Sequence, residues 1–288
     1  MGSYISTLGT GLYQSYTATV TQATLLYQRY TARPVARFRR PDYLKWLKAG
    51  MALKCCGEGL VDFCTDVITT FHTTLITQHG PAVCSSPLNP KKMTYDRGSK
   101  SWRVNCACGV CDTWLQSIAS ELATNQYSWK NTDVNEWPLH PWQLAKVFMG
   151  DGKDPTNHDP ADTDTAGFLQ LIINCQLFAN RLVEAKVKSV REVRNDILHS
   201  PNFEVTSADL TTYLDKMTDL LQEPALQQYA SARRAVDEIN KIDATSLDVN
   251  VAAVRDHESI MYKQMVVEQT TNLKVFRRYK QTLIVIYQ

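Results

Sequence analysis

Arg194, Asn195 and His199 are the residues of this sequence whose types and spacing best suit chemistry. On a helix, residues four apart lie on nearly the same face, so Asn195 and His199 would sit together with Arg194 beside them. An imidazole at a helix C-terminus can exchange a proton near neutral pH, and a guanidinium can hold a phosphate through two hydrogen bonds. Together they suit metal-independent cleavage of RNA by its own 2′-hydroxyl. We call residues 194–199 the Arg–His helix end.

The same residue types also have a structural explanation. Arg and His in the last turn of a helix commonly bond to the final carbonyls and complement the helix dipole. A short motif does not decide between the two interpretations. Three more basic residues of the same segment, Lys186, Lys188 and Arg191, would line a groove that guides an RNA backbone.

The helix that must position these residues has an apolar stripe and a clear end. Val187, Val190, Val193 and Ile197 recur at helical spacing and mark the buried side. Pro201 disfavours helical geometry at Ser200, so the helix should end at His199. A preceding helix is expected to be capped by Asp164 or Thr165 and to carry apolar residues as far as Phe178. A following helix should open at Ser207 or Asp209 and run to about Leu221.

The rest of the chain reads as helices joined by loops. One helix should start at Pro41 and continue to about residue 78, with a break near Gly57–Gly59. Residues 79–105 lack periodicity, and a helix resumes around Cys111–Thr124. The stretch Trp137–Trp142 should lead into a short helix ending by Gly150, followed by a solvated acidic loop at 151–164. Residues 224–288 read mostly as helical hairpins.

A cysteine cluster suggests structural zinc. Cys106, Cys108 and Cys111 lie within six residues, with Cys84 upstream. Four such ligands would close a tetrahedral shell and leave no position for catalysis. Because Cys84 has no second cysteine near it, Cys106, His79 or His140 would complete the set. The alternative is a group of uncoordinated loop thiols. The remaining cysteines, Cys55, Cys56, Cys64 and Cys175, read as small buried residues.

Composition favours a globular protein kept in a reduced compartment. Hydrophobic residues make up 44% and charged residues 21%, which argues against wholesale disorder. A net charge of +2 does not argue for nucleic acid without a local basic patch. We find no transmembrane run and no secretory signal, so a cytoplasmic location is expected.

Residues 1–40 form an arm without acidic residues. Met1-Gly2-x-x-x-Ser6 fits the pattern for N-myristoylation at Gly2, and the arginines between Arg29 and Arg40 could supply the second signal for a membrane surface. A flexible or helical arm and a transit peptide are the alternatives, although the first basic residue stands late for a transit peptide.

Four motifs in order along residues 42–222 resemble a known family. They are Tyr43-x-x-Trp46-x-Lys48-Ala49-Gly50, Cys108-x-x-Cys111-x-x-Trp114, Trp137-Pro138-x-x-x-Trp142-x-x-Ala145-Lys146-x-Phe148-Met149, and Arg194-Asn195-x-Ile197-x-His199-Ser200. The last resembles the signature of the HEPN superfamily, and the whole set looks like the poorly characterised family named after chromosome X open reading frame 38.

The resemblance implies an all-α fold. We expect a HEPN-like helical bundle at 41–223 with an inserted zinc loop at about 79–111, preceded by the basic arm at 1–40 and followed by a C-terminal helical extension at 224–288. Many HEPN proteins form homodimers in which the Arg–His motifs face each other. Active members cleave RNA without metal, and others bind nucleic acid, nucleotides or protein partners.

Two hypotheses for function follow. In the first, the chain is an RNA-binding HEPN protein, and Arg194, Asn195 and His199 act as a metal-independent endoribonuclease. In the second, it is a non-catalytic helical interaction module that the arm tethers to a membrane. Because fold alone does not determine function, the sequence does not decide between the catalytic and the non-catalytic hypothesis.

Overall fold

The computed structural model describes residues 40–80, 93–96, 101–104, 109–123, 128–150, 153, 156, 158–200 and 202–244. This part of the chain is mostly helical, as predicted, with one two-stranded hairpin that the sequence did not indicate. The arm with Gly2 and the C-terminal end lie outside these residues. In the described ranges, no helix combines the length and apolarity needed to span a bilayer.

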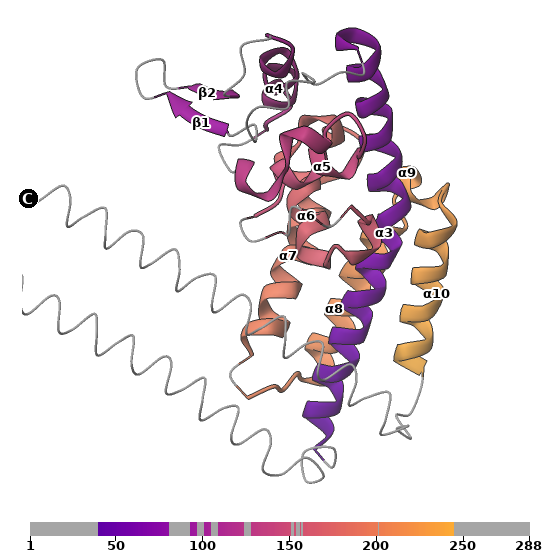
Figure 1. Cartoon of the computed structure of the whole chain (residues 1–288). Helices are drawn as coiled ribbons and strands as arrows, with labels where there is room; N and C mark the ends of the chain where they lie inside the picture. Colours follow the sequence, from indigo (N-terminus) through magenta and orange to yellow (C-terminus); the bar gives the residue numbers. More distant parts are fainter. Residues whose placement is uncertain are drawn as a thin grey trace, which may run out of the picture.

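The longest described element is α3 (Pro41–His79), which runs along the length of the helical bundle in Figure 1. Proline at its first position fits a helix start, since that N–H needs no intrahelical partner. The predicted break near Gly57–Gly59 is wrong, because α3 is continuous. A Cβ on Gly57 would clash with Thr165 Oγ1, and one on Gly59 would lie 2.7 Å from Leu221 Cδ2. These glycines therefore let neighbouring helices approach and do not end the helix.

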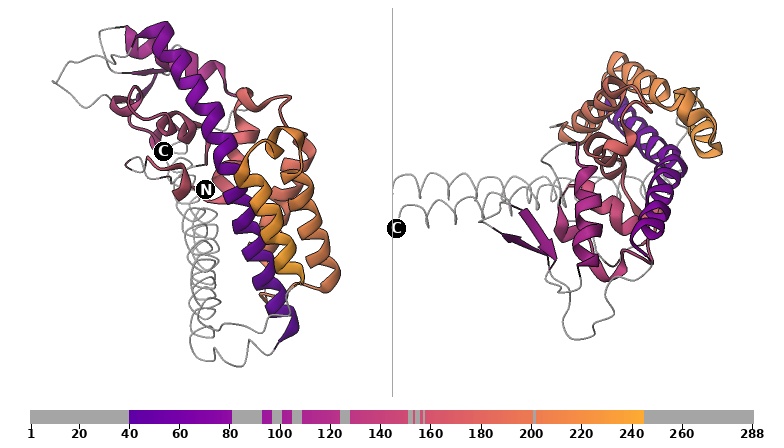
Figure 2. Two further views of the ribbon diagram at one scale, coloured as in Figure 1. Left: turned by 90° about the vertical axis from the view of Figure 1, so that its right-hand side faces the viewer. Right: turned by 90° about the horizontal axis from the view of Figure 1, so that it is seen from above.

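The remaining helices pack around α3 into a bundle. The helix α10 runs beside α3 in the left view of Figure 2, α8 and α6 also pack on α3, and α7 contacts both α6 and α8. Residues predicted as a C-terminal extension thus share the core, with Ala232, Ala235 and Ile239 buried. The bounds are α6 (Thr165–Asn174), α7 (Glu184–His199), α8 (Ser207–Leu221), α9 (Pro224–Gln227) and α10 (Ala230–Ala244).

A small hairpin and α4 (Val110–Ser120) lie near the C-terminal end of α3 (Figure 1). The strands β1 (Met93–Asp96) and β2 (Ser101–Val104) pair antiparallel, with Met93 opposite Val104. The helix α4 buries Trp114 and Ile118, and His79 of α3 bonds to Ser117 of α4 over 2.9 Å. The end of α3 is thereby fixed beside α4.

Residues 128–150, which we call the tryptophan segment, fold into short helical turns. Trp129, Trp137 and Trp142 are all buried. The Trp137 indole donates to Thr132 Oγ1 over 2.8 Å, so its only polar atom is satisfied in the interior. The turns are η1 (Trp129–Asn131), η2 (Val134–Glu136), α5 (Trp142–Ala145) and η3 (Lys146–Phe148), which matches the short helix predicted to end by Gly150.

Two further short turns flank α6. η4 (Pro160–Asp162) lies in the predicted acidic loop, and η5 (Gln176–Phe178) follows α6, which ends at Asn174 and not at Phe178 as expected. Asp164 caps α6, as predicted, by accepting from the Gly167 N–H over 2.9 Å.

Candidate functional site

The Arg–His helix end is built as the sequence predicts. The residues Val187, Val190, Val193 and Ile197 are fully buried, and α7 ends at His199. The last turn is held from outside, because the Trp46 indole of α3 donates to the Ile197 carbonyl oxygen over 2.7 Å. Since that carbonyl lies in the last turn of the helix, this bond satisfies a group that would otherwise lack a partner.

The three motif side chains lie at the surface. Asn195 and His199 are exposed and Arg194 is half-buried, with Arg194 Nη1 donating to Asn195 Oδ1 over 3.2 Å. Arg194 lines a pocket of about 200 Å³, whereas Asn195 and His199 line a neighbouring hollow of about 320 Å³. Among the residues that the structure describes, Arg194 and His199 of one chain therefore line different hollows.

The pocket of Arg194 already contains negative charge. Glu58, Asp162 and Asp164 line it together with Arg194. Burial acts to raise the pKa of Asp164, but the Lys153 ammonium at 2.6 Å, the Gly167 N–H and the charge of Arg194 outweigh this and lower it. Asp164 is therefore ionised at neutral pH, and Arg194 has an anion nearby in its own chain.

The hollow of His199 is also acidic. Asp196, Glu204 and Asp209 line it, and Arg40 forms an ion pair with Glu204. The pKa of Tyr213 is raised by burial and by the neighbouring Asp196 and Asp209. Carboxylates thus outnumber the cations lining this hollow, which opposes the entry of a phosphate into a single copy.

The predicted RNA-guiding residues lie on α7, and two of them have acidic partners. Lys186 Nζ lies 2.8 Å from Asp219 Oδ1 and 2.5 Å from Glu223 Oε1, and hydrogen bonds to these carboxylates raise its pKa. Lys188 pairs with Glu184 over 2.6 Å, one helical turn earlier. Arg191 is exposed. Much of the positive charge of these three residues is therefore offset by carboxylates, and the groove that they were predicted to line stays a prediction.

The proposed zinc ligands fall mainly outside the described residues, where Cys84, Cys106 and Cys108 lie. Cys111 is fully buried in the first turn of α4. Of the two candidate histidines, His79 bonds to Ser117, and His140 lies beside Glu136. Zinc binding by the cysteines stays a prediction.

The other cysteines lie in the core or at its edge, close to the prediction of small buried residues. Cys56, Cys64 and Cys175 are buried and Cys55 is half-buried. Burial raises the pKa of Cys56 and of Cys175 to about 12 and that of Cys55 to about 11. Because the thiolate is the nucleophile, these protonated thiols are poor candidates for catalysis.

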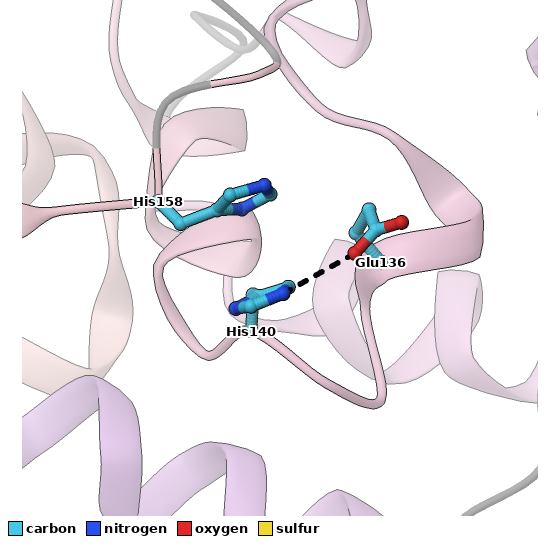
Figure 3. Close-up of side chains that lie close together, drawn as sticks. All are labelled: Glu136, His140 and His158. Carbon is cyan, nitrogen blue, oxygen red and sulfur yellow. Dashed lines mark ion pairs between the residues drawn. The ribbon is translucent and has the colours of Figure 1, made fainter.

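The structure contains a second cluster of polar side chains that the sequence did not predict. Glu136, His140 and His158 converge from two segments, as Figure 3 shows, with His140 Nε2 3.3 Å from Glu136 Oε2. The rings of His140 and His158 stack with centroids 3.9 Å apart. His158, in the acidic loop, is half-buried. The spacing of Glu136 and His140, four residues apart, was the one available signal.

Comparison with known proteins places the chain in a family. Residues 37–282 match the model of a family described as a domain of unknown function, DUF4559. A mouse protein, described as an uncharacterized protein CXorf38 homolog, is 29% identical over 199 residues, which cover 65% of this chain and 58% of the mouse protein. No solved structure matches the chain. The chain belongs to the DUF4559 family, and its resemblance to the proteins of chromosome X open reading frame 38 is confirmed.

Proposed function

We propose that the chain is a HEPN-type RNA-binding protein whose Arg–His helix end holds the phosphate backbone and supports metal-independent cleavage. The observation that carries the proposal is the placement of Arg194, Asn195 and His199 at the surface of one helix end, while the opposite face of α7 supplies the core contacts. Packing on that face therefore does not account for these three side chains.

The cleavage requires two copies of the chain. Arg194 and His199 line separate hollows, and carboxylates line both. The resemblance to HEPN proteins implies a dimer with facing motifs, which would bring two imidazoles and two guanidiniums around one phosphate. Two guanidiniums close to the phosphate would attract it more strongly than one does, because Coulomb attraction rises as the charges approach.

The chemistry then follows from the side chains. His199 of one copy removes the proton of the RNA 2′-hydroxyl, and that oxygen attacks the adjacent phosphorus. The bond from phosphorus to the 5′-oxygen breaks, and His199 of the other copy protonates the leaving oxygen. Arg194 stabilises the negative charge of the phosphorane-like transition state. The products are a 2′,3′-cyclic phosphate and a 5′-hydroxyl.

The test is an RNA cleavage and binding assay with the full chain in the presence of a chelator. We expect cleavage that leaves cyclic-phosphate ends, and a loss of at least about 100-fold in His199→Ala, because general acid–base catalysis contributes that much. Arg194→Ala should weaken both binding and cleavage. Lys241→Ala, which removes an exposed cation on α10, is the matched control and should change neither.

Two outcomes contradict the proposal. One is wild-type protein that neither binds nor cuts RNA. The other is cleavage that persists unchanged in both His199→Ala and Arg194→Ala, since it would then come from another site or a contaminant.

The acidic lining favours a second candidate function, a non-catalytic module that binds protein partners. Asp196, Glu204 and Asp209 together suit a basic segment of a partner better than they suit RNA. A basic peptide should then bind, with an affinity that falls with salt and in Asp196→Asn, while RNA does not bind. Peptide binding whose affinity changes neither with salt nor in Asp196→Asn would exclude this function.

A further inference from the structure

Three metal-ligating side chains meet on a part of the surface that the RNA chemistry does not use. Glu136, His140 and His158 each offer one ligand atom, and these atoms all lie within 4.8 Å of one another. Figure 3 shows the three side chains extending into the same space, with the two rings nearly parallel at 25°. Glu136 and His140 come from one turn, and His158 comes from the loop that follows the tryptophan segment.

The spacing and the atom types suit a transition metal. Zinc binds imidazole nitrogen and carboxylate oxygen at roughly 2.0–2.1 Å, so two ligands of a tetrahedral ion stand about 3.3 Å apart. The Glu136 Oε2 and His140 Nε2 atoms have this separation, at 3.3 Å. Imidazole with carboxylate selects zinc and its neighbours over magnesium or calcium. We propose that Glu136, His140 and His158 bind one divalent transition-metal ion, zinc in the first instance.

The site is accessible to solvent. The side chains of His140 and Glu136 are 41% and 33% exposed, so an ion can reach them without unfolding the chain. Three protein ligands leave one tetrahedral position for water. Two histidines and a carboxylate around an accessible position distinguish this site from the closed cysteine shell predicted elsewhere in the chain.

The frame behind the ligands is already rigid. Gln143 is fully buried, and its Oε1 accepts from the Asp133 N–H over 3.1 Å, which fixes the orientation of the amide. Its Nε2 therefore donates to Nδ1 of His158 over 3.1 Å. In the neutral ring the proton then sits on Nε2. A neutral ring binds a metal ion through its unprotonated nitrogen. The ion therefore takes Nδ1 from Gln143, or it binds Nε2 after the proton has moved to Nδ1. Either route breaks the bond to Gln143, so we expect reversible binding.

The position of the site gives the ion a structural role. It would join the turn at 136–140 to the chain at His158, six residues before Asp164. Asp162, Thr163 and Asp164 line the pocket of Arg194, and the Trp142 indole already donates to Thr163 Oγ1 over 3.0 Å. The metal would add a further tie between the tryptophan segment and the chain that leads into the wall of that pocket.

Zinc counting on the full chain tests the proposal. Metal-stripped wild type and the His140→Gln/His158→Gln double variant are titrated with zinc against a chromogenic chelator. We expect the double variant to bind one equivalent fewer per chain, and Glu136→Gln to bind that equivalent at least about tenfold more weakly. The same titration with cobalt distinguishes this site from a cysteine site, because cobalt bound to thiolates has a characteristic absorption. That absorption, where present, should be the same in wild type and in the double variant.

Thermal melting provides the control for folding. Without metal, Glu136→Gln should melt like wild type, because its side chain is partly exposed. The double variant removes the acceptor of the buried Gln143 amide and should melt at a lower temperature, so the zinc-induced shift of each variant is measured against its own metal-free form. Zinc should raise the melting temperature of wild type and of the matched control Glu192→Gln by more than that of Glu136→Gln. Equal zinc counts and equal zinc-induced shifts in wild type and the double variant would overturn the proposal and leave a stacked histidine pair beside an ion pair.

Discussion

The tryptophan segment and the Arg–His helix end carry two of the motifs that resemble the family, yet their environments are opposite. Trp137 and Trp142 are buried, and their indole nitrogens donate to threonine hydroxyls inside the protein. Asn195 and His199 point to solvent at the end of α7. A motif that resembles the family thus stabilises the fold in the tryptophan segment and offers candidate chemistry at the Arg–His helix end. The burial of the motif side chains distinguishes these two roles.

The buried region is held by a satisfied polar network. Asn131 Nδ2 donates to the carbonyl oxygens of Lys146 and Gly150 over 3.1 and 2.9 Å, and its Oδ1 accepts from the Lys153 N–H over 3.2 Å. Thr132 donates to the Gln143 carbonyl oxygen over 2.8 Å. Such a network gives one defined structure, because leaving any member without a partner costs the full desolvation of that group.

The largest effect should come from Trp137→Ala. Removing a fully buried tryptophan leaves a cavity and a hydroxyl without its donor, so we expect a loss of about 3–5 kcal/mol in the free energy of unfolding. Urea denaturation measures it. Leu139→Ala is the matched control, because Leu139 is 69% exposed in the same segment. A similar loss in both variants would show that the segment is not packed as described.

The features that could be predicted from the sequence are those that depend on residues close together along the chain. The stripe of α7, its end before Pro201 and the cap at Asp164 are set within one or two turns, and all three are confirmed. The break expected near Gly57 was wrong. Gly57 is needed because Thr165, more than a hundred residues later in the sequence, packs against it and leaves no space for a Cβ. His158 and His140 likewise meet only through folding of the intervening chain. No local periodicity encodes such contacts.

We expect an intermediate effect on the free energy of unfolding when the pH is lowered, and we assign it to His72. This buried imidazole bonds to the Trp137 carbonyl oxygen over 2.8 Å, and burial lowers its pKa from 6.5. The unfolded chain therefore takes up the proton at a higher pH than the folded one does. The contribution to stability is complete above pH 6.5 and is lost as the pH falls through the lowered pKa.

Urea midpoints measured on both sides of pH 6.5 test this expectation. His72→Gln should flatten the pH dependence in that range, whereas His199→Ala should retain it. An unchanged slope in His72→Gln would assign the proton uptake to another group and would remove His72 from the network around the tryptophan segment.

The smallest effect should come from His199→Ala, which tests the other side of the comparison. Because His199 is exposed, we expect the free energy of unfolding to change by no more than about 0.5 kcal/mol. Ile197→Ala, two residues earlier and fully buried, should cost about 2–5 kcal/mol by the same urea measurement. A cost near that of Ile197→Ala would mean that the imidazole stabilises the end of α7. The Arg–His helix end would then be a folding motif like the tryptophan segment, and the contrast between the two regions would disappear.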